Sequence, residues 1–210
     1  MSTSHRTPVV PLEAGAGPEN PPCPACGEPL FGWLAPQPGL AGAVSRCESC
    51  GLAVVGGEPD PAEALQELDR LRDGEVLLIA NRASFAAALG SAGWSGLTPG
   101  SRYLFTPEAV RRLVARRDQV VTSTRWRPGA SIAATWQTLL NSVTFGHNVA
   151  LAALGGGPIA APARKRWQRR IDALASIVLA IPAMAIALPI ELAGGLARRG
   201  AVLRMRTQLL

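Results

Sequence analysis

Four cysteines in two C-x-x-C pairs are the residues of this 210-residue sequence whose types and spacing can do chemistry. One pair lies in CPACG (23–27) and the other in CESCG (47–51), which gives C-x2-C-x20-C-x2-C. Each pair forms a tight turn whose following glycine can adopt the positive φ that directs thiolates to one point. Four thiolates leave Zn²⁺ no open coordination position, so the site stabilises a small fold without acting on a substrate. The predicted zinc ligands are Cys23, Cys26, Cys47 and Cys50.

Two other uses of the cysteines remain open. Iron in a rubredoxin-like site is the second interpretation, because four thiolates also suit iron. A redox dithiol is the third, since the surrounding sequence lacks a βαβ pattern. All four cysteines fall in the pairs, which leaves none for a disulfide framework and indicates a reducing compartment. The N-terminus has no apolar run of signal-peptide length, so we expect a disordered leader and a cytoplasmic protein.

Charge divides the chain into two unlike halves. Residues 1–80 carry four Arg and eleven Asp or Glu, whereas residues 81–210 carry seventeen Lys or Arg and four Asp or Glu. With 48% apolar residues overall, the sequence also has more apolar character than a typical soluble protein needs. A basic, apolar C-terminal half suits an anionic membrane surface, and a nucleic-acid backbone is the rival interpretation.

Helix caps and apolar runs predict the elements that follow the cysteines. Asp60 can cap a helix that begins at Pro61, and Thr106 can cap a second helix that begins at Pro107. Five consecutive apolar residues, 76–80, are typical of a strand covered on both faces. Two more strands are expected at residues 119–126, rich in β-branched side chains, and 201–208, whose alternation suggests an edge or partly covered strand.

The order of these segments resembles a known family. EPDPAEALQELDRLRDGEVLLIAN, then GWSGL, then YLFTPEAVRRLVARRDQVV is similar to the C-terminal third of class I S-adenosylmethionine-dependent methyltransferases, in the subgroup that begins with a cysteine ribbon. The similarity covers about residues 58–126. It implies that residues 76–80 are the fifth strand of that fold, ending at Asn81, with residues 119–126 as the sixth strand and residues 201–208 as the seventh.

The half of the family fold that binds the cofactor has no counterpart in this chain. The resemblance implies a Gly-rich turn after a first strand and an acidic residue after a second, but only nine residues separate Cys50 from Asp60. Nine residues are too few for one βαβ unit. The glycine run 155–157 lacks the strand-turn-helix setting of a nucleotide loop and is interpreted as a hinge. We therefore expect that the isolated chain does not bind S-adenosylmethionine and has no catalytic or cofactor-binding residues.

The missing fourth strand would leave residues 76–80 with an apolar edge of unpaired backbone groups. We expect another surface to cover that edge: a protein partner, a second copy in a homodimer, or the ribbon folding back.

An apolar C-terminal segment is the second distinctive feature. Residues 173–190 are eighteen residues without a charge, which at ~1.5 Å per residue extend ~27 Å, just short of a bilayer core. Pro182 and Pro189 interrupt the segment, and basic clusters flank both of its ends. We expect two broken helices lying in the membrane interface, with a buried helix pair in a soluble core as the alternative. A nucleic-acid surface is the less favoured interpretation, because the basic clusters adjoin apolar helices instead of displayed aromatic residues.

Together these observations predict an α+β protein with five segments. They are a leader (1–21), a zinc ribbon (22–57), a truncated, Rossmann-like methyltransferase remnant of about three strands (58–128), an apolar helical membrane-interface insertion (129–200) and a terminal strand (201–210). The function expected is that of a non-catalytic methyltransferase-like scaffold or partner, peripheral to the inner face of the membrane. A methyltransferase that borrows its cofactor site from a second chain is the alternative, and a nucleic-acid-binding ribbon is the third. His5 and His147 are isolated and expected to have no metal role.

Overall fold

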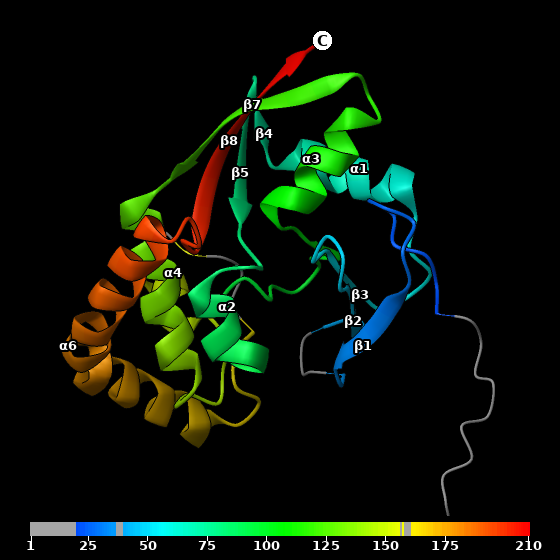
Figure 1. Cartoon of the computed structure of the whole chain (residues 1–210). Helices are drawn as coiled ribbons and strands as arrows, with labels where there is room; N and C mark the ends of the chain where they lie inside the picture. Colours follow the sequence, from blue (N-terminus) through cyan, green and yellow to red (C-terminus); the bar gives the residue numbers. More distant parts are fainter. Residues whose placement is uncertain (1–19, 37–39, 156, 158–160) are drawn as a thin grey trace, which may run out of the picture.

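The computed structural model describes residues 20–36, 40–155, 157 and 161–210, and within these ranges the chain is a mixed α/β protein (Figure 1). The described residues form two antiparallel four-stranded sheets and six α-helices. The expected leader, apart from its last two residues, lies outside the described ranges, as does the middle residue of the glycine run 155–157.

The first sheet is built mainly by the cysteine ribbon. Its strands are β1 (Leu30–Leu34), β2 (Val44–Cys47), β3 (Ala53–Val55) and β6 (Tyr103–Leu104), in the order β1-β2-β3-β6. Every neighbouring pair is antiparallel. Because β6 comes from the segment after the ribbon, the two parts of the chain are joined by strand pairing.

The second sheet contains the strands expected of the remnant. Its order is β4-β5-β8-β7, made of β4 (Arg72–Asp73), β5 (Val76–Ala80), β8 (Val202–Leu209) and β7 (Gln119–Trp126). Strands β5 and β7 have the predicted bounds, and β8 is shifted by one residue. The terminal strand is expected at an edge or partly covered. Strand β8 alternates between buried and exposed residues, so it is partly covered, but it does not lie at an edge: it pairs with β5 at residues 202–206 and with β7 at residues 203–209. The fold is therefore mixed α/β with antiparallel sheets.

Strand β5 is covered on one face, which corrects the expectation of two covered faces. Leu77 and Ile79 are fully buried, whereas Leu78 and Ala80 are exposed. An apolar run predicts burial throughout, because periodicity cannot distinguish a half-covered strand from a fully covered one when every residue is apolar. A helix layer covers the inner face alone.

Helices α1 (Pro61–Arg70) and α3 (Pro107–Ala115) form that layer and begin where the caps predict. The Asp60 side chain accepts from the N–H of Ala62 at 2.8 Å, and the Thr106 hydroxyl accepts from the N–H of Ala109 at 3.1 Å. A further short helix, α2 (Phe85–Gly90), is followed by a 3₁₀ turn (Ser91–Gly93).

One core joins the ribbon to the helices and to the second sheet. Three of the four cysteines are buried in the same cluster as Leu68 of α1, Leu113 of α3 and the inward-facing Leu77 and Met205 of the sheet. The boundary at residue 57 therefore separates two segments of sequence that fold around shared apolar side chains.

The C-terminal helices form a separate layer at the end of the second sheet. They are α4 (Pro128–Asn141), α5 (Val149–Ala153) and α6 (Arg166–Leu196), with α4 and α6 side by side (Figure 1). The prediction of two broken helices is wrong, since α6 continues for 31 residues through both prolines. Each proline removes one backbone donor, and packing against α4 offsets that loss. Next to Pro182, the Trp136 indole N–H donates to the Ala180 carbonyl at 2.9 Å.

Candidate functional site

The structure brings the four cysteines of the ribbon to one point. Their Sγ atoms all lie within 4.8 Å of one another. Two contacts cross between the knuckles, 3.5 Å from Cys23 to Cys50 and 3.4 Å from Cys26 to Cys47. A tetrahedral site with metal–sulfur bonds of about 2.3 Å requires sulfur atoms about 3.8 Å apart. The spacing therefore fits a single metal ion held by all four thiolates.

Backbone geometry and polar contacts prepare the thiols for a metal. The contact between the sulfurs of Cys23 and Cys50 lowers the pKa of Cys23 to about 5, and the same contact together with burial raises the pKa of Cys50. Burial raises the pKa of Cys26. Backbone N–H groups of Ala25 and Leu52 also point at the sulfurs of Cys23 and Cys50 respectively. The backbone contacts favour the thiolates of Cys23 and Cys50, the form that coordinates metal, whereas the contact between the two sulfurs favours the thiolate of Cys23 only.

The glycines after the knuckles are not equivalent. Gly27 and Gly51 both have positive φ, +82° and +75°. A Cβ on Gly27 would meet no atom within 4 Å, whereas a Cβ on Gly51 would lie 2.8 Å from Cγ2 of Thr106. Thr106 also donates its hydroxyl to the carbonyl of Cys50. The N-terminus of α3 is thereby fixed directly against the second knuckle.

A closed set of four sulfurs determines what the centre can do. Cys23, Cys47 and Cys50 are buried, and Cys26 is partly buried. Four protein ligands leave no position for water or substrate, so a bound metal would supply folding energy rather than Lewis-acid chemistry.

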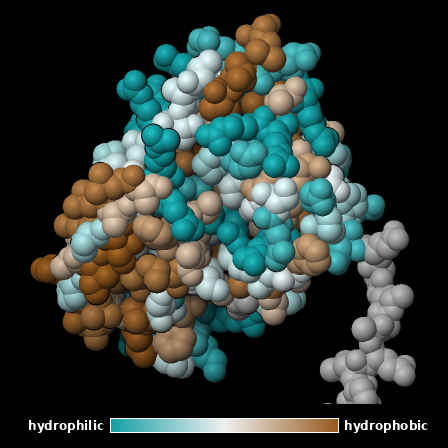
Figure 2. All heavy atoms as spheres, in the orientation of Figure 1, coloured by the Kyte–Doolittle hydropathy of each residue, from teal (hydrophilic) through white to brown (hydrophobic). Residues whose placement is uncertain are grey.

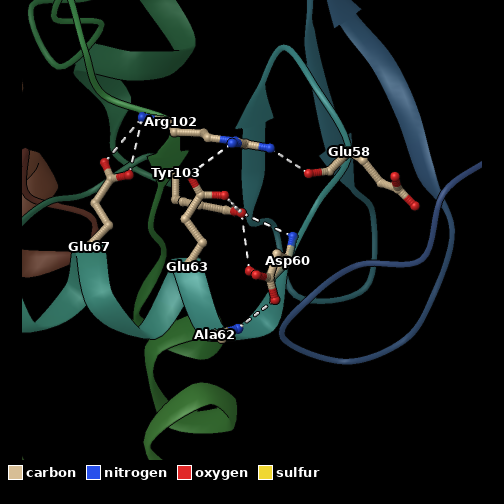
Figure 3. A network of polar contacts seen from close by, with 7 residues as sticks. All are labelled: Glu58, Asp60, Ala62, Glu63, Glu67, Arg102 and Tyr103. Atoms are coloured by element: carbon tan, nitrogen blue, oxygen red, sulfur yellow. Dashed lines mark hydrogen bonds and ion pairs between the residues drawn. The ribbon is translucent and has the colours of Figure 1, made fainter.

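A second polar constellation ties α1 to the ribbon sheet (Figure 3). The guanidinium of Arg102 contacts the Glu63 carboxylate at 2.8 Å and the Glu58 carbonyl, while its backbone N–H donates to Glu67 at 3.1 and 3.2 Å. The Tyr103 hydroxyl accepts from the N–H of Asp60 at 3.1 Å and lies 3.1 Å from the Glu63 carboxylate. Burial raises the pKa of Glu67 and of Tyr103. Both carboxylates are occupied, so the network positions β6 against α1.

Helix α6 presents an uninterrupted apolar face to the outside. From residue 171 to residue 197, every exposed position holds Ala, Ile, Leu, Val or Pro. Ile177 and Ile181 are 75% and 81% exposed, and the surface over α6 is the large brown region of Figure 2. Among the described helices, α6 is the one long and apolar enough to cross a membrane by length and composition, and 11% of that apolar window is buried. The other large exposed side chains of the face are Ile171, Leu174, Val178, Ile186, Leu188, Leu192 and Leu196.

The two acidic residues of α6 both point inward. Asp172 accepts from the backbone N–H groups of Phe145 and Gly146 at 2.7 and 2.9 Å. Glu191 accepts from the Thr135 hydroxyl of α4 and from the N–H of Ala201 at 3.1 Å. Their burial leaves the outer face without charge and fastens both ends of α6 to the rest of the protein. Exposed basic residues flank the helix: Arg164, Lys165, Arg166, Arg169 and Arg170 before the apolar face, Arg198 and Arg199 after it.

Of the candidate residues named from the sequence, the cysteines come together in the structure and the described histidine does not join them. The structure brings the four cysteines together. His147 lies apart from them, partly buried beside Asn141 at 3.4 Å, and burial lowers its pKa. His5 lies outside the described residues.

Two further groups were missed from sequence. The Arg102 network had a local signal, Glu63 and Glu67 one helical turn apart, but its cation comes from a distant loop. The second group, three arginines on one sheet face, requires the pairing of β7 with β8 and has no local signal. Comparison of the chain with protein-family models, with curated proteins and with solved structures gave no match.

Proposed function

We propose that the chain is a zinc-stabilised, methyltransferase-like protein that lies on a membrane surface and serves there as a partner or scaffold without catalysis of its own. The single observation that carries the membrane part is the outer face of α6. It presents nine large apolar side chains and no exposed charged side chain from residue 171 to residue 197, and basic residues cluster at both of its ends. An apolar face between cationic ends is the pattern of a helix that lies in the interface of an anionic bilayer.

An orientation along the surface agrees better with the contacts of α6 than a crossing does. The inward stripe, which includes Ala183, Ala187, Glu191 and Gly194, packs against α4. The end of α6 leads within a few residues into β8, the inner strand of the second sheet. At ~1.5 Å per residue, the exposed face extends about 40 Å along the helix axis. Because α6 is attached to the folded part at both ends, we expect its axis to lie parallel to the membrane surface, with the exposed face inserted into the bilayer.

Zinc is the metal we propose for the cysteine centre. Four thiolates at tetrahedral spacing suit zinc, and the centre is closed to substrates. Thiols of this kind persist in a reducing compartment, so we place the protein at the cytoplasmic, inner face of the membrane.

The methyltransferase-like part of the proposal draws support from strand pairing. Strands β5, β7 and β8, which the resemblance makes the fifth, sixth and seventh strands, belong to one sheet. Among the described residues, β4 pairs with β5 at Val76 and Leu77 and the Leu78 N–H donates to the Leu71 carbonyl at 3.1 Å, so the edge has no partner strand at residues 79–80. This edge favours a second candidate function, a methyltransferase completed by another chain, and it is also where we place a partner or a second copy.

The membrane proposal is tested by flotation of the zinc-loaded full-length chain with vesicles of phosphatidylcholine and phosphatidylglycerol. We expect the wild type to float with the vesicles. Ile177→Asp combined with Ile181→Asp should abolish flotation, because charged groups would then have to enter the acyl region. Leu209→Asp is the matched control, since Leu209 is 77% exposed on β8 and lies outside the helix face. Flotation of the double variant equal to that of the wild type would overturn the membrane role.

The scaffold and enzyme candidates are separated by titration calorimetry with S-adenosylmethionine. We expect no saturable binding to the isolated chain. Micromolar binding by the chain alone would overturn the non-catalytic proposal. Binding by the chain only in complex with a second protein would support the borrowed-site enzyme instead.

A further inference from the structure

Three arginines converge on the outer face of the second sheet. Arg125 of β7 is paired directly with Arg204 of β8, and Ser123 is paired with Arg206. Residues directly opposite in an antiparallel pair point to the same side of a sheet, so these side chains share one face. Together they line a hollow of about 140 Å³. The face is the one that α1 and α3 leave uncovered.

No acidic side chain neutralises this cluster within the described part of the chain. The guanidinium groups of Arg125, Arg204 and Arg206 take part in none of the ion pairs or hydrogen bonds found there, and the backbone carbonyl of Arg206 accepts a bond from the Thr122 hydroxyl. The nearest carboxylate on the same face by strand register, that of Asp73, is separated from Arg206 by Val76. Like charges directly opposite across strands destabilise a sheet unless an anion lies between them. Guanidinium groups bind phosphate oxygens through paired, charge-assisted hydrogen bonds.

An apolar hollow adjoins the arginines through Leu78, and it extends past β5 to Ile79 of the buried face and to Glu67 of α1. Leu78 is the cross-strand neighbour of Arg204, and Ala80 is that of Val202. These three apolar residues line a hollow of about 410 Å³ together with Ala133 of α4. That volume is within the range of small-molecule sites, about 300–1,000 Å³. Its other apolar walls come from Leu71, Trp94, Leu104, Phe105, Ala130, Ala134, Leu151 and Ala201.

We propose that this face is a binding site for a single amphiphile that carries a phosphate group. The phosphate would lie among Arg125, Arg204 and Arg206, and the apolar chain would extend past Leu78 into the hollow against α4. The site goes beyond the proposed function, because it lies on the sheet and uses none of the α6 residues that would face the bilayer. The acidic residue in the wall of the apolar hollow, Glu67, already accepts hydrogen bonds from the backbone N–H of Arg102.

The apolar hollow favours an amphiphile over other ligands that carry phosphate. Free phosphate would use the arginines alone and leave the hollow without a function. Nucleic acid requires a groove of positive charge with aromatic rings for stacking. The arginine hollow has no aromatic lining, and the three aromatic residues of the neighbouring hollow, Trp94, Tyr103 and Phe105, are buried in the core rather than displayed for stacking.

Binding of dodecyl phosphate below its critical micelle concentration tests the proposal. Calorimetry is performed on the full zinc-loaded chain and on the chain carrying Ile177→Asp and Ile181→Asp, which removes contributions from the α6 face. We expect saturable binding in both. Arg204→Gln should weaken binding about tenfold or more through the loss of charged hydrogen bonds, and Ala133→Phe should do the same by filling the hollow. Arg116→Gln, which changes an exposed arginine at the C-cap of α3, is the matched control and should bind as the wild type does.

Three competing results would overturn the site. Inorganic phosphate that binds as tightly as dodecyl phosphate would reduce it to an anion site. Dodecyl maltoside that binds equally well would show that the arginines do not contribute. A single-stranded oligonucleotide that binds more tightly, and loses that binding in Arg204→Gln, would assign the face to nucleic acid. Because Arg204→Gln should still float with vesicles, failure of this site and failure of the membrane role give different results.

Discussion

At the scale of single residues, the cysteine centre depends on neighbours that are far away in sequence. The C-x-x-C spacing was sufficient to predict the four sulfurs at one point, because each knuckle is a local turn. The contact of Thr106 with the second knuckle could not be predicted, since Thr106 had already been explained as a helix cap. Thr106 both caps α3 and contacts the second knuckle, and the sequence pattern indicates only the cap, which is the local contact.

The two knuckle glycines provide a matched pair of substitutions. Gly27→Ala should cost about 1 kcal/mol, the strain of a Cβ at positive φ. Gly51→Ala should cost about 1–3 kcal/mol more, because its Cβ would also overlap Thr106 and force the start of α3 to move. Urea denaturation of the zinc-loaded proteins measures both. Equal losses would show that α3 is not held against the knuckle.

At the scale of elements, the apolar pattern predicts which helices and strands exist better than it predicts what each of them packs against. Strands β5 and β7 and the starts of α1 and α3 lie where caps and β-branched residues place them. The position of β8 inside its sheet was not predictable from its alternation, because partner strands on both sides are supplied by segments more than 75 residues earlier. The continuity of α6 was missed for a related reason: α4, which supports it, contributes nothing to the local pattern around the prolines.

Pro182 should limit the stability of α6. Pro182→Ala restores the N–H that a helix donates to the carbonyl four residues earlier, so we expect a gain of about 1–2 kcal/mol in the free energy of unfolding. Pro189→Ala is the matched substitution at the second proline of α6, and we expect it to raise the free energy of unfolding by a similar amount. Thermal unfolding checks both. A loss of stability in Pro182→Ala would instead mean that packing on α4 requires the bend.

At the scale of the whole molecule, the ribbon is part of the main core. Its cysteines and Leu30 pack in the same cluster as α1, α3 and the inner face of the second sheet, whereas Trp136 and Leu140 of α4 pack in another cluster with α6. The sequence predicts consecutive segments, but their apolar side chains pack across the segment boundaries, and the sequence pattern does not show which segments share a core.

Removal of the metal should therefore destabilise elements that are distant from the cysteines in the sequence. Chelation of zinc takes away binding energy of order 10 kcal/mol from the folded state. We expect hydrogen exchange to accelerate in α1 and α3, which share the core of the ribbon, well before it does so in α4 and α6. Simultaneous loss of protection everywhere would indicate one cooperative unit. A change confined to the ribbon would contradict the shared core.

The central claim is that the outer face of α6 lies in a membrane, and photo-crosslinking tests it most directly. Wild-type protein would be bound to vesicles that contain phosphatidylcholine with a diazirine in its acyl chain, illuminated and mapped by mass spectrometry. The account predicts acyl adducts on α6 peptides, residues 171–197, and none on α3. Bound protein with adducts absent from α6, or spread evenly over the chain, would contradict it.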